Sequence, residues 1–217
     1  MPHMILSQLF SDPWVFAATM LAFLFALSIH EASHAFASFL MGDRTAQREG
    51  RLTLNPLSHI DWMGFLMLVT IGFGWGKPVP FNPYNLRWQR VGPVLVAAAG
   101  PLSNFFLGTL AVVLYAFVSP HVAEGNLLTY FLLLLAIMNM LLGLFNLIPL
   151  PPLDGSKALL AILAAPKYAE ARAFLQTRGP MILLGFVVIE LFLGINLFGW
   201  LHTWAVTIVN ALYRLFA

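Results

Sequence analysis

Two histidines and a glutamate interrupt a run of apolar residues that extends from Trp14 to Met41. They form the pattern His30-Glu31-x-x-His34. On a helix, positions i and i+4 share one face, so both imidazoles can reach one metal ion, and Glu31 beside them can take a proton from a water molecule. Polar groups of this kind inside a membrane helix are costly and indicate a functional site. The competing interpretation is a chance pattern whose polar groups pair with neighbouring helices.

The composition indicates a protein that crosses the membrane several times. Of the 217 residues, 60% are hydrophobic and only 9% are charged, whereas soluble domains carry about 25% charged residues. The length suggests a single integral-membrane domain over residues 1–217. The chain has no cysteine, which excludes a disulfide framework, a thiolate metal site and a catalytic thiol. The formal net charge of +2 gives no reason to expect nucleic-acid binding.

The fold class that we expect is an all-α polytopic membrane protein. Three long apolar stretches predict membrane-spanning helices at about 14–41, 91–118 and 127–147. These three spans would form the core of the domain, over about residues 14–165. The third span also places two amides in the apolar layer, those of Asn139 and Asn146.

The segments around these spans are shorter or more polar. Residues 64–76 are apolar but too short to span and are broken by glycines, so the region near 64–80 is expected to be a membrane-embedded hairpin or re-entrant segment. A short helix is expected at 157–164. Residues 180–217 are expected to add one or two C-terminal spans, and residues 1–12 to lie at the membrane interface.

Lysine and arginine are concentrated in two loops. Residues 42–90 contain six and residues 155–179 contain four, whereas the amino end and residues 119–126 contain none. The positive-inside rule places both basic loops in the cytoplasm. His34 then lies about 10 Å below the cytoplasmic face, and Asp154 follows the third span at the same face.

Zinc enzymes commonly use three protein ligands and a water, and His30, His34 and Asp154 supply such a set. Two other candidates for the third ligand, His59 and Asp61, lie in a polar loop, whereas metal sites prefer rigid elements. Glu190, the other membrane carboxylate, is a ligand, a proton relay or a structural or gating partner, and we favour the last. The remaining histidines are expected to have no role in the site: His3, His121 and His202.

Four stretches stand out by their metal-ligand residues, their prolines or their glycines. In chain order they are residues 30–34; 51–61 with Gly64; 77–83 with 100–104; and Asn146-Leu147-Ile148-Pro149-Leu150-Pro151-Pro152-Leu153-Asp154-Gly155. Together they resemble the site-2 proteases, a family of intramembrane zinc metalloproteases, and the last stretch is similar to that family's N-x-x-P-x-x-x-L-D-G. An HExxH pattern alone is moderately specific, but its combination with Leu-Asp-Gly in membrane spans is highly specific.

The resemblance implies one zinc ion per chain, held by His30, His34 and Asp154, with Glu31 as the general base. It also implies that several further residues bind substrate or orient the site, and that residues 64–76 form a hairpin able to pair with an unwound substrate strand. The chain is expected to differ from many relatives in three ways: no PDZ segment interrupts it, no CBS-type domain follows and no additional span precedes the HExxH helix. The residues expected to bind substrate or orient the site are Asn104, Asn146, Gly74 and Pro149.

We therefore expect a zinc metalloendopeptidase of a bacterial or archaeal cell membrane. It would hydrolyse peptide bonds of transmembrane protein or peptide substrates within the lipid bilayer, near the cytoplasmic face. One alternative is a catalytically inactive zinc-bound protein that binds membrane partners, but the intact Glu31 argues against it. Another is a metal or proton transporter, which should carry polar groups through the full membrane thickness, whereas here they cluster towards one face.

Overall fold

The computed structural model describes residues 9–193 and 195–217, and the first eight residues of the predicted interfacial segment, with His3, lie outside this part of the chain. The described residues form helices and no strand, so the predicted all-α class is confirmed. The helices are α2 (Pro13–Leu40), α3 (Thr45–Arg48), α4 (Trp62–Ile71), α5 (Gly92–Val118), α6 (Leu127–Asn146), α7 (Gly155–Ile162), α8 (Ala169–Leu193) and α9 (Gly199–Phe216).

Four helical segments are long and apolar enough to cross a membrane: α2, α5 with its extension to His121, α6, and α8 with the turn from Pro166. The first three match the predicted spans, and the expectation of a protein with several spans is confirmed. In the C-terminal region α8 meets this criterion, whereas the more amphipathic α9 does not and instead packs on α5 and α6. The C-terminal part of the chain thus adds one helix of spanning length and one helix that covers the core.

Helix α8 begins at Ala169, well before residue 180, where the C-terminal spans were expected to begin, and it contains the pair Gly179-Pro180. The residues that precede this pair are mostly good helix formers, and Pro180 lies inside the helix rather than at its start. A proline is tolerated inside a membrane helix because neighbouring groups can satisfy the carbonyl that it frees. The short helix predicted at 157–164 is present as α7, two residues earlier.

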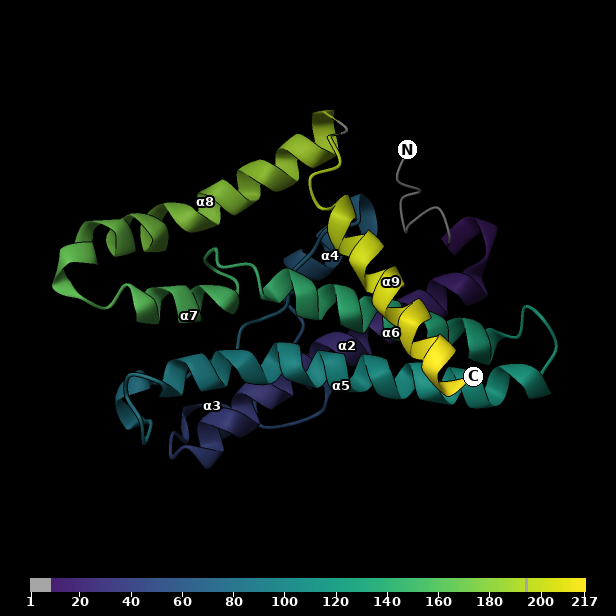
Figure 1. Cartoon of the computed structure of the whole chain (residues 1–217), viewed down its shortest axis with the longest axis horizontal. Helices are drawn as coiled ribbons and strands as arrows, with labels where there is room; N and C mark the ends of the chain where they lie inside the picture. Colours follow the sequence, from purple (N-terminus) through teal and green to yellow (C-terminus); the bar gives the residue numbers. More distant parts are fainter. Residues whose placement is uncertain (1–8, 194) are drawn as a thin grey trace.

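Helices α2, α5 and α6 lie side by side, and α9 crosses over α5 and α6 (Figure 1). Small side chains at helix contacts allow the backbones to approach closely in a membrane protein. Each of the four helices contributes one alanine with no exposed surface to the central apolar cluster: Ala22, Ala111, Ala136 and Ala205. This close packing holds α2 and its polar residues at a fixed register against α5 and α6.

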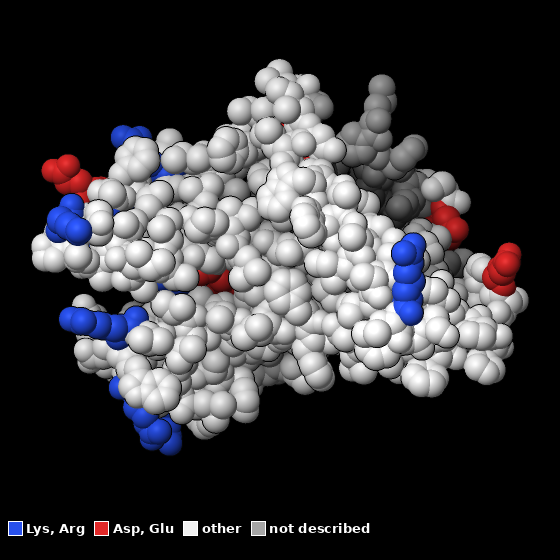
Figure 2. Space-filling view, in the orientation of Figure 1, with Lys and Arg blue, Asp and Glu red and all other residues white. Residues whose placement is uncertain are grey.

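Few charged side chains lie in the middle of the face that Figure 2 draws. Figure 2 shows most of the Lys and Arg side chains on this face at its left end, where α3, α7 and the start of α5 lie in Figure 1. The long middle part of the face carries very few charged groups. A broad apolar band between two more polar ends is the surface that a lipid bilayer requires.

The segment near 64–80 is a short helix followed by a chain that returns alongside it. Asp61 caps helix α4, and its carboxylate accepts a hydrogen bond from the Gly64 amide at 2.8 Å. After the helix the chain returns in extended form, and one isolated antiparallel bridge joins Ile60 to Gly76. Within the described residues this segment is therefore a helix with an extended return rather than the β-hairpin that the resemblance implied.

Two glycines make this return possible. A methyl group on Gly74 would collide with the carbonyl oxygen of Gly64, and a methyl group on Gly64 would collide with the carbonyl oxygen of Trp75. Only glycine permits backbones to approach so closely. Gly74, which was predicted to bind substrate or to orient the site, thus lies at the contact between α4 and the returning chain.

Candidate metal centre and active site

Three potential metal ligands meet at one point. The Nε2 atoms of His30 and His34 lie 3.1 Å apart, and each lies 3.2 Å from Oδ2 of Asp154. Both histidines are buried in α2, and Asp154 stands directly before α7. The three ligand atoms form a nearly equilateral triangle.

The size and the chemistry of this triangle fit a zinc ion. Ligand atoms of a tetrahedral zinc, each about 2.0–2.1 Å from the metal, lie about 3.3 Å apart. The Asp154 Oδ2 atom is buried and accepts no hydrogen bond from the described residues. A buried carboxylate oxygen without a donor requires a cation or a proton beside it.

The outer ring nitrogens determine the tautomers of both histidines. Nδ1 of His30 lies 2.6 Å from Oδ1 of Asn104, and Nδ1 of His34 lies 2.7 Å from the carbonyl oxygen of Val96. Both partners are acceptors, so each imidazole donates its Nδ1 hydrogen and directs the lone pair of Nε2 at Asp154. Three acceptors that face one another at about 3 Å without a donor between them constitute a preformed cation site.

A relay of two buried asparagines orients His30. The amide nitrogen of Asn104 donates to the carbonyl oxygen of Ala26 at 3.1 Å and to Oδ1 of Asn139 at 2.8 Å, which leaves its own oxygen to accept from His30. Asn139 in turn donates to the carbonyl oxygen of Leu135 at 2.8 Å. Neither asparagine has exposed surface. The relay links α2, α5 and α6 and fixes the direction of each amide.

Asp154 is the N-cap residue of helix α7, but its side chain does not cap the helix. An aspartate at the N-cap commonly accepts a hydrogen bond from the first turn of its helix, but the Asp154 side chain makes no such bond to α7. It turns to the imidazoles instead. With both Nε2 atoms unprotonated, the imidazoles offer the Asp154 carboxylate no hydrogen, so a cation held between the three groups would keep this carboxylate ionised.

Glu31 is buried next to this triangle without being part of it. Its Oε2 accepts a hydrogen bond from the Val79 amide at 3.1 Å. Val79 belongs to the extended segment that follows the bridge at Gly76. The carboxylate is thus held by one oxygen, and the other oxygen has no hydrogen bond within the described residues.

Helix α5 supplies a surface without a side chain behind the imidazoles. A Cβ atom at Gly100 would lie 2.5 Å from Cε1 and Nε2 of His34 and 2.6 Å from Cε1 of His30. Real Cβ contacts are essentially never shorter than 3.0 Å, so any side chain here would displace both rings. Gly100 is therefore required by the ligand geometry.

We expect Gly100→Ala to weaken zinc binding by at least the 10- to 100-fold that is typical of changes beside metal ligands. Zinc affinity measured by competition with a chelator checks this. Gly185→Ala, in helix α8, is the matched control, because a Cβ there would meet no atom within 4 Å. Equal zinc affinity in the two variants would contradict the close contact between Gly100 and the imidazoles.

The other candidates for the third ligand are engaged elsewhere. His59 is fully buried, with Nε2 2.8 Å from the Thr53 carbonyl oxygen and Nδ1 3.4 Å from Nη2 of Arg51. Asp61 caps α4. Glu190 accepts a hydrogen bond from the Phe198 amide at 3.0 Å, a structural contact between α8 and the turn before α9. His121 and His202 are exposed.

The four residues predicted to bind substrate or orient the site lie in different surroundings, and they do not form one cluster in the structure. Asn104 contacts His30 directly. Asn146 donates to the Leu142 carbonyl oxygen of its own helix at 3.0 Å, and Gly74 faces α4. Pro149 lies at the edge of an apolar cavity. Sequence reasoning did not assign Asn139 to the site, although an amide inside an apolar span indicates a buried polar contact.

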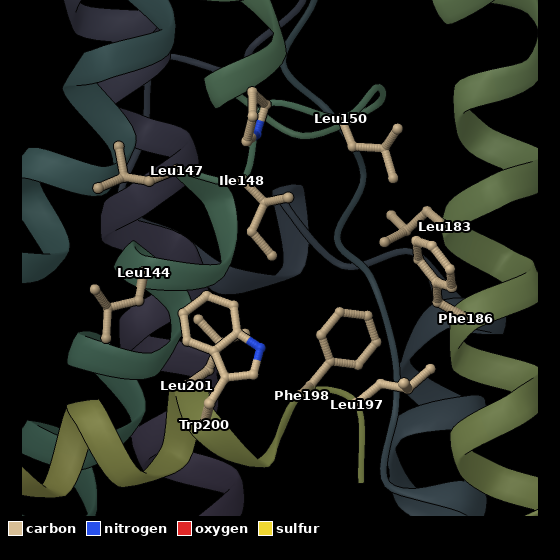
Figure 3. Close-up of a pocket in the computed structure, with 11 residues that line it drawn as sticks. Leu144, Leu147, Ile148, Leu150, Leu183, Phe186, Leu197, Phe198, Trp200 and Leu201 are labelled. Atoms are coloured by element: carbon tan, nitrogen blue, oxygen red, sulfur yellow. The ribbon is translucent and has the colours of Figure 1, made fainter. Parts of the chain in front are cut away.

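The apolar cavity has a volume of about 550 Å³ and lies between the end of α6, the loop to α7, α8 and the start of α9. Figure 3 shows leucine, isoleucine and aromatic side chains directed into it from these elements. Its lining includes Ile148, Leu150 and Leu183, and the loop continues from Leu150 to Asp154. The cavity is therefore an apolar space beside the loop that carries the third ligand.

Comparisons with known proteins agree with this chemistry. Residues 119–186 match the family model described as "Peptidase family M50". The chain is 40% identical over 135 residues to "Putative zinc metalloprotease YwhC" of Bacillus subtilis, and this alignment covers 60% of this chain and 62% of that protein. It is 33% identical over 151 residues to "Putative zinc metalloprotease Rip2" of Mycolicibacterium smegmatis, which covers 67% of this chain and 57% of that protein. The chain thus spans about three fifths of the length of these relatives, and no solved structure matches it significantly.

Proposed function

Because the chain belongs to peptidase family M50, the site-2 protease family, we propose that it is a zinc-dependent intramembrane protease. The observation that carries this proposal is the triangle of acceptors formed by His30, His34 and Asp154, with the Glu31 carboxylate beside it. The two imidazoles and the carboxylate would hold the zinc ion. The substrates would be membrane-spanning proteins or peptides, cleaved near the cytoplasmic end of a span.

The residues of the chain have separate tasks in the proposed reaction. A bound zinc ion would lower the pKa of a water molecule towards neutrality and polarise the scissile carbonyl. Glu31 would take the proton of the attacking water and pass it to the leaving amine, which is general acid–base catalysis by one carboxylate. Asn104 and Asn139 would keep the His30 tautomer that leaves Nε2 free for the metal.

The distribution of charge supports an active site that faces the cytoplasm. The ligands lie in the second half of α2 and at the start of α7, and both positions adjoin the two loops that contain ten of the eleven Lys and Arg residues. Positive loops remain on the cytoplasmic side of membranes. Helices α5 and α6 contain no Asp, Glu, His, Lys or Arg, so they offer no chain of ionisable groups across the bilayer for transport.

Cleavage of a single-span peptide in lipid vesicles tests the proposal. The expected result is cleavage that a zinc chelator abolishes and that added zinc restores. Failure of zinc-loaded wild-type protein to cleave any member of a library of single-span peptides would contradict the proteolytic function. Zinc flux into the vesicles without cleavage would favour a transporter.

We further propose that the apolar cavity receives a side chain of the membrane-spanning substrate. Leu183→Trp would fill it, because Leu183 is 7% exposed and lines the cavity. A substrate side chain that can no longer be buried in the cavity loses about 1.5–3 kcal/mol of binding free energy. This loss should raise KM for a single-span peptide about tenfold or more. KM measured in detergent checks this, with zinc content unchanged. Leu184→Trp is the matched control, since Leu184 is 58% exposed, and equal KM values in the two variants would contradict this role.

A further inference from the structure

The amide that holds Glu31 belongs to an unusual tripeptide. Val79 lies between Pro78 and Pro80, and proline has no N–H group. The Val79 amide is thus the only backbone donor of the tripeptide, and it points at Oε2 of Glu31. Residues before proline adopt extended backbone, which keeps this part of the chain straight.

A buried arginine holds the other side of the same peptide group. Arg51 is 4% exposed, and its Nη1 donates to the carbonyl oxygen of Pro78 at 3.3 Å. This carbonyl and the Val79 amide form one planar peptide unit, and in a trans unit the oxygen and the hydrogen point in opposite directions. Arg51 therefore lies at one edge of the peptide plane and Glu31 at the opposite edge. A cation on the carbonyl side also polarises the unit and strengthens its N–H as a donor.

Further bonds determine where Arg51 and the extended segment lie. Nη2 of Arg51 donates to the Lys77 carbonyl oxygen at 2.5 Å, and the Lys77 amide donates to the His59 carbonyl oxygen at 2.9 Å. Nε2 of His59 donates to Thr53, so its Nδ1 is free to accept from Arg51. Burial and the charge of Arg51 lower the pKa of His59, which keeps this imidazole a neutral acceptor.

The far end of the segment is also fixed. Asp43 has no exposed surface, and its carboxylate accepts hydrogen bonds from the Asn82 amide at 2.7 Å and from Nδ2 of Asn85 at 3.1 Å. The chain from Lys77 to Asn82 is therefore anchored at both ends. The Val79 amide lies between the two anchors.

We propose that Arg51 is a positioning residue for the general base. Through the Pro78–Val79 peptide plane it fixes Oε2 of Glu31, so that Oε1 stays directed towards the water to be deprotonated. This inference rests on the proposed role of Glu31. It assigns a task to the stretch from Arg51 to Asp61, which contributes no ligand to the zinc site.

Replacing Arg51 with glutamine tests this task. Because a misplacement of about 1 Å costs up to about 100-fold in rate, we expect kcat to fall 10- to 100-fold, with KM within twofold and zinc content unchanged. Arg51→Lys keeps the charge but not the pair of hydrogen bonds that the guanidinium donates. Its kcat should therefore lie between those of wild type and Arg51→Gln. The matched control is Arg48→Gln, an exposed arginine three residues away, which should behave as wild type.

A second pair of variants changes the amide and leaves Arg51 in place. Val79→Pro removes the N–H group and should reproduce the loss of kcat, whereas Val79→Ala keeps it and should retain kcat. With selectively labelled valine, hydrogen exchange of the Val79 amide in zinc-free protein should be at least tenfold faster in Arg51→Gln than in Arg48→Gln.

The outcomes separate this inference from the proposed function. Inactive wild-type protein would contradict the proposed function, while the exchange measurement would still test the contact. Active wild-type protein with equal kcat in Arg51→Gln and Arg48→Gln, or in Val79→Pro and Val79→Ala, would overturn the positioning role.

Discussion

Glu31→Gln is expected to abolish peptide hydrolysis while about one zinc ion per chain remains bound. Glu31 is not among the three ligand atoms of the triangle, so its charge is not needed to hold the metal. Glutamine has the same shape and can still accept the hydrogen bond from Val79 through its amide oxygen, but it cannot take a proton. Removal of a general base costs about 10²–10⁴-fold in rate. Measurement of kcat/KM on a single-span peptide, together with the zinc content, checks both parts.

The control for this variant is Glu190→Gln, which alters the other carboxylate in a membrane span. Glu190 binds the amide of Phe198 at the end of α8, so its loss should affect stability rather than the chemical step. A rate in Glu31→Gln within tenfold of the wild-type rate would rule out Glu31 as the general base. Loss of zinc from this variant would instead indicate a ligand role for Glu31.

Asp154→Ala is expected to remove zinc and, with it, activity. The remaining two imidazoles form an incomplete set, because catalytic zinc sites use three protein ligands. We expect a loss of zinc affinity greater than the 10- to 100-fold that is typical of outer partners. Helix α7 should persist, because the Asp154 side chain does not cap it. Competition with a chelator measures the affinity, and circular dichroism checks the helix content.

Asp61→Asn is the matched control for the ligand set, since Asp61 was a competing candidate for the third ligand but caps α4. It should bind zinc as tightly as wild type. Zinc binding that depends on Asp61 and not on Asp154 would move the third ligand to the polar loop.

The positions of the spans and of the His-Glu-His pattern could be predicted because they depend on local sequence. An apolar stretch of sufficient length determines a membrane helix, and the spacing of His30 and His34 puts them on one face in any helix. Asp154 could be matched to them from the order of the spans and the positions of the basic loops. These features require no knowledge of how the helices pack.

The choice between Asn139 and Asn146 depends on packing. The two are seven residues apart on α6, so they share nearly one face but lie about 10 Å apart along the helix. Only the register of α6 against α5 brings Asn139 rather than Asn146 to Asn104. The sequence of α6 contains both asparagines but not this register.

The contacts that loop residues make in the site could not be predicted from local sequence either. Arg51 and Val79 have no periodic pattern, and they make contacts with residues more than twenty positions away, such as Arg51 with Pro78 and Val79 with Glu31. Gly100 likewise has no local signal, since its importance comes from two imidazoles on another helix. Tertiary contacts of this kind determine the fine geometry of the site.

Zinc K-edge X-ray absorption of the purified, zinc-loaded protein tests the central claim most directly. The ligand set of His30, His34 and Asp154 predicts a shell of two imidazole nitrogens and oxygen ligands at about 2.0–2.2 Å. In Asp154→Ala this spectrum should be lost, and in Glu31→Gln it should persist. A third imidazole in the wild-type shell, or a spectrum unchanged by Asp154→Ala, would contradict the metal centre on which the proposed function depends.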